Sequence, residues 1–283
     1  MGVNFRKILI PVDFTTNSNT AITRALDFCA NEPVHLFLVH FHLQVPVGDI
    51  GAYYFYPGLN LRRQKVLEGI LSQKFKEILD HIPLTENMCI ETAVVVTTKV
   101  EDGIVEFSTR HNIDLVIIGK RKNHIIFPFL NTVVPSRIAS GTGIPVFTVR
   151  SGAAGNPIRS VVVAVGRVFP DRKIEMLDAL RDRFNFELNI ISIVERKNLV
   201  AEAKKVLHEV VSRYKVRFNG KINSELFIAS NKARALLDHV QTIKADLLIV
   251  SPFSETKLTW TGTHISDEVS SQSGIQVLAV RPV

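Results

Sequence analysis

The chain has 283 residues, enough for one large domain or two ordinary ones, and its 46% hydrophobic and 22% charged residues are typical of a globular protein. The formal net charge of +7 is not concentrated in a long basic cluster, and no nucleic-acid-binding motif is present, so we expect no DNA or RNA partner. No apolar run approaches the roughly 18 residues of a membrane helix, and the start of the chain lacks a signal-peptide pattern, which predicts a cytoplasmic protein without a membrane partner.

Apolar strand-like runs alternate with helix-like segments through the first half of the chain. The expected strands are 7–13, 34–41, 89–97, 114–119 and 144–150, and the expected helices are 17–30, 59–82, 100–112 and 132–143. The strands are apolar on both faces, as in a parallel sheet that helices cover on both sides. The long helix has apolar residues at helical spacing, which predict one buried face made of Leu61, Val66, Leu67, Ile70, Leu71, Phe75, Ile78 and Leu79.

The same order of elements then returns in the second half. The segments 160–166, 170–184, 186–194, 197–214, 222–230 and 232–251 repeat, in order, the strands and helices that precede residue 120. The segment 131–150 aligns without a gap to 262–281, which places Thr132 on Thr263. A repeat of this length is a domain rather than a solenoid unit. The predicted boundaries are 1–150 for the first domain, 151–157 for a small flexible linker and 158–283 for the second domain.

Three stretches of the first half resemble one known family. They are "KILIPVDFTTNSNTAITRALDFC" (7–29), "DLVIIG" (114–119) and "SGTGIPVFTVR" (140–150), and together they look like the universal stress protein family in its tandem form. The resemblance covers nearly all of 5–150 and, more loosely, 159–283. It implies an α/β fold of two tandem domains, each a five-stranded parallel sheet with helices on both faces, similar to the adenine nucleotide alpha hydrolases. Because family members commonly form dimers, it also implies an intramolecular pseudo-dimer of the two domains and leaves a further homodimer open.

Many members of this family bind ATP, and others do not. The binders resemble each other in a pattern of Gly, two residues, Gly, nine residues, and Gly followed by Ser or Thr. The first glycines let the backbone approach ribose and phosphate, and the last pair opens a helix whose free N–H groups face the phosphates. An Asp at the end of the first strand helps to hold the adenine, in the crevice beyond the carboxyl ends of the strands. The resemblance therefore implies an adenine nucleotide as the ligand.

The first half keeps part of this pattern. Asp13 takes the place of the adenine-side Asp, and Gly119 takes the place of the first glycine. Lys122 stands where the second glycine is expected, and only eight residues separate it from Asn131, which with Thr132 replaces the last pair. The predicted nucleotide site of the first half comprises Pro11, Val12, Asp13, Ile118, Gly119, Lys122, Asn131 and Thr132.

These residues also have structural interpretations. Asp13 could instead cap the following loop or helix. Lys120, Arg121 and Lys122 could supply charge to a phosphate, but the apolar stretch 125–130 is typical of a loop packed on its own domain or on the other half. A nucleotide site and a packed loop therefore both remain open.

The second half keeps less of the pattern. Gly166 replaces the Asp, and Ser251 and Ser254 replace the first two glycines. The helix-opening pair Gly262 and Thr263 remains, with only seven residues between Ser254 and Gly262. The sequence predicts a remnant of the site here, made of Ser251, Ser254, Gly262 and Thr263.

No motif for chemical catalysis is present. The sequence contains no nucleophile elbow, metalloprotease motif, Walker A motif or kinase motif, so we predict no catalytic residue and no metal. His40 and His42 alternate along a strand and point to the same face, but no third metal ligand follows from the spacing. Cys29 and Cys89 lack CxxC spacing and are expected to be buried free thiols.

Three functional hypotheses follow from these observations. The main one is a non-catalytic stress-response module with a degenerate ATP site in the first domain. The second is a protein-interaction scaffold that uses the apolar loop 125–130 and the aromatic loop 43–60. The third is a slow ATPase, for which the sequence supplies no general base.

Overall fold

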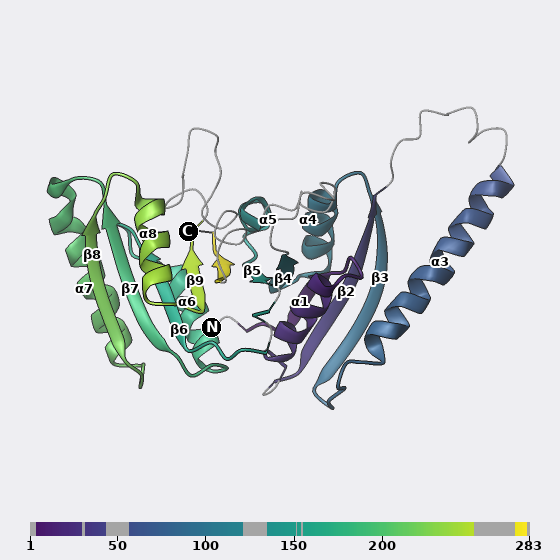
Figure 1. Ribbon diagram of the computed structural model, residues 1–283, viewed down its shortest axis with the longest axis horizontal. Helices are drawn as coiled ribbons and strands as arrows, with labels where there is room; N and C mark the ends of the chain where they lie inside the picture. The colour runs from purple at the N-terminus through teal and green to yellow at the C-terminus, as the bar shows by residue number, and fades with distance from the viewer. Residues whose placement is uncertain are drawn as a thin grey trace.

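The structure is a computed structural model that describes residues 4–29, 32–43, 57–120, 135–150, 152–153, 155–251 and 275–281. Of residues 57–64 and Ala233 it describes the backbone alone. The described strands form a ten-stranded sheet with helices on both faces (Figure 1). No helix in this part of the chain is long and apolar enough to cross a bilayer.

The sheet contains two five-stranded halves that mirror each other. The strands of the first half are β1 (Lys7–Pro11), β2 (Val34–Leu43), β3 (Met88–Thr97), β4 (Leu115–Lys120) and β5 (Val146–Arg150). Those of the second half are β6 (Ser160–Val165), β7 (Glu187–Val194), β8 (Ile222–Ile228), β9 (Leu247–Val250) and β10 (Gln276–Ala279). The order across the sheet is β3-β2-β1-β4-β5-β10-β9-β6-β7-β8, so the second half repeats the first in reverse. The α/β fold predicted from the alternation of strands and helices is confirmed in both halves.

Helices cover both faces of this sheet, as predicted. The first half contains α1 (Thr16–Leu26), α3 (Pro57–Leu79), α4 (Val100–His111) and α5 (Pro135–Thr142). The second half contains α6 (Asp171–Arg181), the short 3-10 helix η2 (Lys197–Leu199), α7 (Val200–Lys215) and α8 (Lys232–Thr242). Helices α1, α3, α6 and α7 pack on one face, and α4, α5 and α8 pack on the other.

Polar residues explain where several helices begin and end. The hydroxyl of Thr15 accepts a hydrogen bond from the N–H of Asn17 and caps α1. The side chain of Asn231 accepts one from the N–H of Arg234 at 2.9 Å and caps α8. Asn112 ends α4 in the left-handed conformation, with φ of 51°, which asparagine tolerates better than most residues.

The two halves meet at β5 and β10. These strands pair antiparallel, with Phe147 opposite Leu278, whereas the other strand pairs of the described sheet are parallel. Figure 1 shows the yellow strand β10 beside β5 near the centre of the molecule. One apolar cluster extends under this junction, where the ring of Phe28 lies 6.1 Å from that of Phe147 and 5.5 Å from that of Phe184. The halves therefore share a continuous sheet and a continuous core.

The segment predicted as a flexible linker is anchored to the first half. Arg24 of α1 is 1% exposed, and its Nη2 donates to the carbonyls of Ala153 at 2.7 Å and Asn156 at 2.9 Å. Its Nη1 donates to the carboxylate of Asp27 at 2.5 Å. One buried side chain thus joins α1 to the stretch of chain that leads into the second half.

Helix α3 buries less of its apolar face than its sequence predicts. Leu71 and Phe75 are each 5% exposed, but Val66 and Ile70 are 62% and 50% exposed. The helix lies beside β3, the edge strand of the sheet, and Figure 1 shows it diverging from that strand toward its own start. The prediction is therefore wrong for Val66 and Ile70, because among the described residues no further strand lies beyond β3 for this part of α3 to cover.

The two cysteines differ in burial. Cys29 is buried, as predicted, and burial raises the pKa of its thiol to about 11. Cys89 is exposed, so the prediction that both thiols are buried is wrong. Cys89 lies in β3, where every residue retains some exposure because the strand forms the edge of the sheet.

Candidate functional site: the carboxyl ends of the strands

The carboxylate of Asp13 lies just beyond the carboxyl end of β1 and is held by the first turn of α1. Its Oδ1 accepts hydrogen bonds from the N–H of Thr15 at 3.0 Å, from the hydroxyl of Thr15 at 2.7 Å and from the hydroxyl of Ser18. The Ser18 hydroxyl in turn accepts from the N–H of Asp13 at 2.8 Å. Asp13 therefore fills the capping role that the sequence allowed. Its Oδ2 receives no hydrogen bond from any described residue, so this atom can accept one from a ligand.

The residue after Asp13 has a strained backbone. Phe14 has a φ of 58°, in the left-handed region, which costs a non-glycine residue about 1–2 kcal/mol. Its ring centroid lies 5.1 Å from that of Phe75 and 5.0 Å from that of His40, and the ammonium of Lys74 lies 5.2 Å from the same centroid. These ring contacts hold Phe14 in place. The sequence analysis missed this residue, because a phenylalanine carries no signal for a left-handed conformation.

His40 of β2 contacts the chain just before Asp13. Its Nδ1 lies 2.8 Å from the carbonyl oxygen of Val12, which only accepts, so Nδ1 carries the proton. Burial lowers the pKa of His40, while the hydrogen bond to Val12 opposes this shift. The ring of His42 lies 6.1 Å away. Within the described ranges, no group of three or more His, Cys, Asp or Glu side chains is arranged to hold a metal ion.

Gly119 lies at the carboxyl end of β4, the strand next to β1. A Cβ atom at this position would lie 1.9 Å from the carbonyl oxygen of Asn17 in α1. Only glycine therefore lets the first turn of α1 approach β4 so closely. The glycine predicted to admit a phosphate thus has a packing role of its own, and the two roles are compatible.

The structure brings together five of the predicted residues of the first half. Pro11, Val12, Asp13, Ile118 and Gly119 lie at the carboxyl ends of the neighbouring strands β1 and β4. Lys122, Asn131 and Thr132 lie outside the described residues, as do the loop 125–130 and residues 44–56 of the aromatic loop. The part of the site that depends on the glycine pattern therefore stays a prediction.

In the second half, a pocket of about 590 Å³ lies at the carboxyl ends of β6, β7 and β9. Gly166, which the repeat aligns with Asp13, lines this pocket together with the buried Ser251. The other predicted residues of this half, Ser254, Gly262 and Thr263, lie outside the described part of the chain. The volume falls in the range typical of small-molecule sites. The sequence predicted only a remnant here and did not indicate a pocket of this size.

Charged side chains line much of this pocket. The cations are Arg167, Arg172, Lys173 and Lys232, and the carboxylates are those of Asp171 and Glu202. Lys173 is 2% exposed, and its ammonium donates to the carbonyl of Ala164, the penultimate residue of β6, at 2.5 Å. The sequence analysis missed Lys173 because a lysine in an amphipathic helix is expected on the solvent face. An alignment of α6 with α1, residue by residue, could have identified Lys173, because it takes the place of Ser18.

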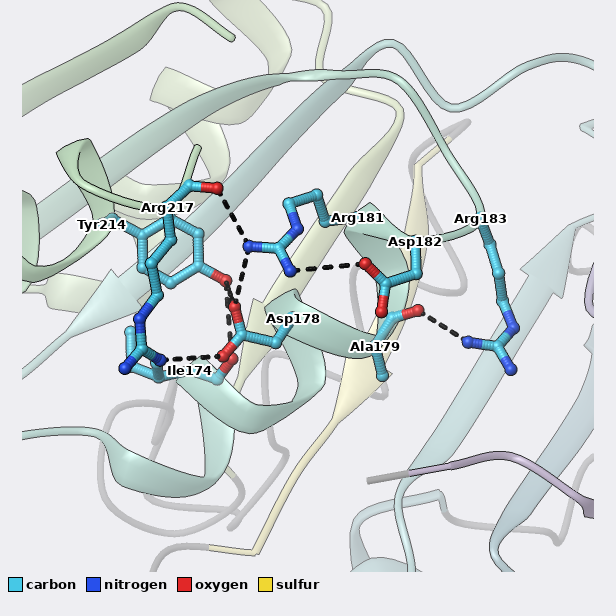
Figure 2. Close-up of polar contacts among 8 residues, drawn as sticks. All are labelled: Ile174, Asp178, Ala179, Arg181, Asp182, Arg183, Tyr214 and Arg217. Carbon is cyan, nitrogen blue, oxygen red and sulfur yellow. Dashed lines mark hydrogen bonds and ion pairs between the residues drawn. The ribbon is translucent and has the colours of Figure 1, made fainter. Parts of the chain in front are cut away.

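Helix α6, which forms one wall of the pocket, is braced against α7 by the network in Figure 2. The hydroxyl of Tyr214 donates to the carboxylate of Asp178 at 3.3 Å and lies 3.4 Å from the carbonyl oxygen of Ile174. Arg181 donates to Asp178 at 3.4 Å and to the carbonyl of Arg217 at 3.0 Å. Tyr214 is 1% exposed, and burial raises the pKa of its hydroxyl far above the ordinary value. The hydroxyl therefore stays protonated and keeps its donor role.

Comparisons with known proteins agree with this fold. The model of the universal stress protein family matches residues 4–150. A universal stress protein from Archaeoglobus fulgidus DSM 4304 is 16% identical over 98% of both chains, with a TM-score of 0.62. A putative universal stress protein from Pseudomonas aeruginosa UCBPP-PA14 is 13% identical over 98% of this chain and 94% of its own, with a TM-score of 0.61. The cytoplasmic domain of a prokaryotic cation chloride cotransporter, 11% identical over 98% of this chain and 95% of its own, has a TM-score of 0.52. A comparison with curated proteins found no match.

Proposed function

Since this chain belongs to the universal stress protein family, we propose that it is a cytoplasmic, non-catalytic stress-response module whose first half responds to an adenine nucleotide. One observation carries the proposal: Asp13 is fixed at the carboxyl end of β1 with Oδ2 open to a ligand among the described residues. In parallel α/β sheets, this edge is where ligands bind.

The proposed contacts follow from the geometry of Asp13. Its Oδ2 accepts a hydrogen bond from the amino group or a hydroxyl of the nucleotide, while Oδ1 stays bonded to Thr15 and Ser18. Gly119 lies at the neighbouring strand end, where the phosphates would pass. The proposal assigns the phosphates to Lys122, Asn131 and Thr132, as the family pattern implies.

Titration calorimetry with ATP and AMP tests this proposal. Asp13→Asn keeps the size of the side chain and an oxygen acceptor but removes the charge, so we expect about tenfold weaker binding. Glu106→Gln, which removes an equal charge from the exposed surface of α4, serves as the matched control and should bind as the wild type does. If the wild type does not bind ATP at millimolar concentration, the proposed response to an adenine nucleotide is wrong.

The non-catalytic part of the proposal has its own test. The described residues around Asp13 supply no general base beyond a carboxylate that already accepts three hydrogen bonds and the half-buried His40, whose Nδ1 is bonded to the carbonyl of Val12. We expect purified protein to form ADP from ATP no faster than the Asp13→Asn variant. Faster turnover in the wild type would favour the slow ATPase instead.

We also propose that residues 1–150 and 158–283 are two domains that pair as an intramolecular pseudo-dimer. The antiparallel pairing of β5 with β10 supports this proposal. So does Arg183 of the second half, which donates to the side chain of Asn4 at 3.2 Å and lies 3.5 Å from the carboxylate of Glu32. The mirrored strand order supports a twofold relation between the halves.

A second candidate function is that of an interaction scaffold, which the exposed apolar residues at the edge of the first half favour. Val66 and Ile70 of α3 are 62% and 50% exposed, and Val94 and Val96 of β3 are 42% and 60% exposed. The partner proposed is a second copy of this chain, since β3 also offers an edge for strand pairing. Sedimentation equilibrium should give a mass above one chain that Val66→Ser with Ile70→Ser reduces. A single-chain mass in the wild type would count against it.

A further inference from the structure

The end of β6 lacks the carboxylate and the aromatic ring that lie at the end of β1. The repeat places Gly166 on Asp13 and Arg167 on Phe14. The ring of Phe14 packs against α3 and β2, whereas the side chain of Arg167 is exposed and its Nη1 lies 3.4 Å from the carboxylate of Glu202. A Cβ atom at Gly166 would meet nothing within 4 Å. The end of β6 therefore has room that side chains occupy at the end of β1.

The strand beside β6 has also lost the two histidines of its counterpart. The repeat of β1 in β6, together with the pairing of these strands with β2 and β7, places Ser192 on His40 and Val194 on His42. Ser192 is fully buried, and Val194 lines the pocket. One imidazole is thus replaced by a small side chain and the other by an aliphatic one. The second crevice is therefore wider and less polar than the first.

Aliphatic and aromatic side chains form much of the wall of the pocket. They include Val165, Phe169, Ile191, Ile193, Leu199 and Leu236. Ile191 and Leu236 belong to the core cluster beneath α8, and Val165 belongs to the cluster beneath α6 and α7. The wall is therefore continuous with the packed core on both faces of the sheet. With a volume of about 590 Å³, such a pocket has the size and the surface of a site for a small organic molecule.

Each charged side chain in the described lining of the pocket is already bonded within the protein. The ion pairs are Arg167 with Glu202 at 3.4 Å, Arg172 with Glu175 at 3.2 Å, Lys232 with Glu195 at 3.3 Å and Asp171 with Arg213 at 3.9 Å. Lys173 donates to the carbonyl of Ala164 at 2.5 Å. A charged ligand would exchange its water for groups that already have partners, which is unfavourable. An uncharged ligand leaves these contacts intact.

We propose that the pocket of the second half binds an uncharged, largely apolar organic molecule. Its body fills the space beside Gly166 and contacts the apolar wall. The ligand class differs from that of the first half, because Gly166 has no side chain to accept a hydrogen bond from an adenine amino group, as Asp13 is proposed to do. The two halves of one chain then bind different ligands. This proposal concerns a separate site and does not rest on the nucleotide site of the first half.

Fluorescence titration with N-phenylnaphthylamine tests the proposal. This probe is uncharged and apolar, and its emission rises when it leaves water. We expect saturable binding of one molecule per chain. Anilinonaphthalene sulfonate has the same rings with an added sulfonate and should bind at least about tenfold more weakly, because the sulfonate would leave water without gaining a free partner.

Variants at Gly166 assign the binding to this pocket. Gly166→Phe fills the open space and should weaken binding of N-phenylnaphthylamine at least about tenfold, since a filled pocket excludes the probe. Gly166→Asp is a smaller change that returns the carboxylate of the first half, and it should weaken binding about tenfold because the carboxylate would lose water when the probe binds. Thermal unfolding establishes that each variant is folded.

Gly141 provides matched controls for both variants. It lies at an exposed position of α5, where a Cβ atom would lie 4.0 Å from the side chain of Val105, an ordinary contact. Gly141→Phe and Gly141→Asp add the same side chains outside the pocket. Both should bind N-phenylnaphthylamine as the wild type does.

Several outcomes would overturn the proposal. These are no saturable binding of N-phenylnaphthylamine by the wild type at micromolar concentration, equal or tighter binding of the sulfonate, or an unchanged affinity in Gly166→Phe. Displacement of N-phenylnaphthylamine by ATP in the Asp13→Asn variant would show that the pocket takes a nucleotide and would also overturn it. ATP binding that Asp13→Asn weakens and Gly166→Phe leaves unchanged belongs to the first half, so the two proposals fail separately.

Discussion

Asp114 and Asp246 make the same pair of hydrogen bonds in the two halves of the chain. Each lies just before a central strand and accepts two backbone N–H groups on Oδ2: Asp114 from Arg6 at 3.0 Å and Lys7 at 2.8 Å, Asp246 from Arg159 at 2.8 Å and Ser160 at 2.9 Å. The carboxylate thereby fixes the start of β1 beside β4, and the start of β6 beside β9. The duplication has preserved a structural contact as well as a pattern of strands.

Replacing either carboxylate should destabilise the protein. Asp114→Ala and Asp246→Ala each leave two N–H groups without their acceptor, which we expect to lower the free energy of unfolding by about 1–3 kcal/mol. Asp→Asn at the same positions keeps one oxygen acceptor and should cost less. Urea unfolding followed by circular dichroism measures the differences. Wild-type stability in both alanine variants would show that the two hydrogen bonds contribute nothing.

Arg24 should be the most sensitive contact between α1 and the segment that joins the halves. Arg24→Met removes three hydrogen bonds from a side chain that is 1% exposed and leaves the carbonyls of Ala153 and Asn156 without this donor. We expect a loss of about 2–4 kcal/mol in unfolding free energy. Arg24→Lys keeps the charge but lacks the planar guanidinium that directs donors to these three acceptors. Its stability should therefore lie between that of Arg24→Met and that of the wild type. Wild-type unfolding free energy in Arg24→Lys would mean that the charge, rather than the guanidinium geometry, stabilises this contact.

Gly119→Ala tests the packing role of the predicted loop glycine. The added Cβ would overlap the carbonyl oxygen of Asn17, so the first turn of α1 must move, and we expect a destabilisation of about 2–4 kcal/mol. Gly69→Ala in α3 is the matched control, because its Cβ meets nothing within 4 Å and alanine favours a helix by up to about 1 kcal/mol. Thermal unfolding should therefore shift in opposite directions for the two variants. A shift in the same direction would contradict the close approach of α1 to β4.

The strands and the duplication could be predicted from the sequence, because runs such as 114–119 are apolar on both faces and 131–150 aligns with 262–281. The junction between the halves could not. Which edge strands pair depends on how the two sheets meet, and neither β5 nor β10 carries a sequence signal for a partner. The exposure of Val66 and Ile70 was missed for a similar reason: helical spacing indicates an apolar face but not whether a strand lies beneath it.

The candidate site was predictable where a residue type has a specific role. Asp13 and Gly119 were identified because they occupy the places of the adenine-side Asp and the first loop glycine in the family that the sequence resembles, and the structure places both at one edge of the sheet. Lys173 was not, since its burial depends on the close approach of α6 to β6 rather than on its neighbours in sequence. Local patterns therefore indicated the first crevice and, in the second half, only the remnant of a site that includes Ser251.

The stability of the protein should fall on acidification partly through His40. Burial lowers the pKa of His40 in the folded state below that of an unfolded histidine, about 6.5. As pH falls below that value, the unfolded chain takes up a proton that the folded protein does not, so the free energy of unfolding decreases until the lowered pKa is passed. Lys74 and His42 also oppose a charge on the ring, whereas the hydrogen bond to the carbonyl of Val12 and the nearby carboxylate of Asp13 favour it.

His40→Gln removes the titrating group and retains a donor for the carbonyl of Val12. We expect the variant to be somewhat less stable at neutral pH, because the ring contact with Phe14 is lost. Its unfolding free energy should nevertheless depend less steeply on pH, between about pH 7 and pH 5, than that of the wild type. His81→Gln, at an exposed position just after α3, is the matched control, because it removes a histidine that lies far from the Asp13 crevice in sequence. Parallel pH dependences for the wild type and His40→Gln, measured by urea unfolding, would show that His40 does not couple folding to protonation.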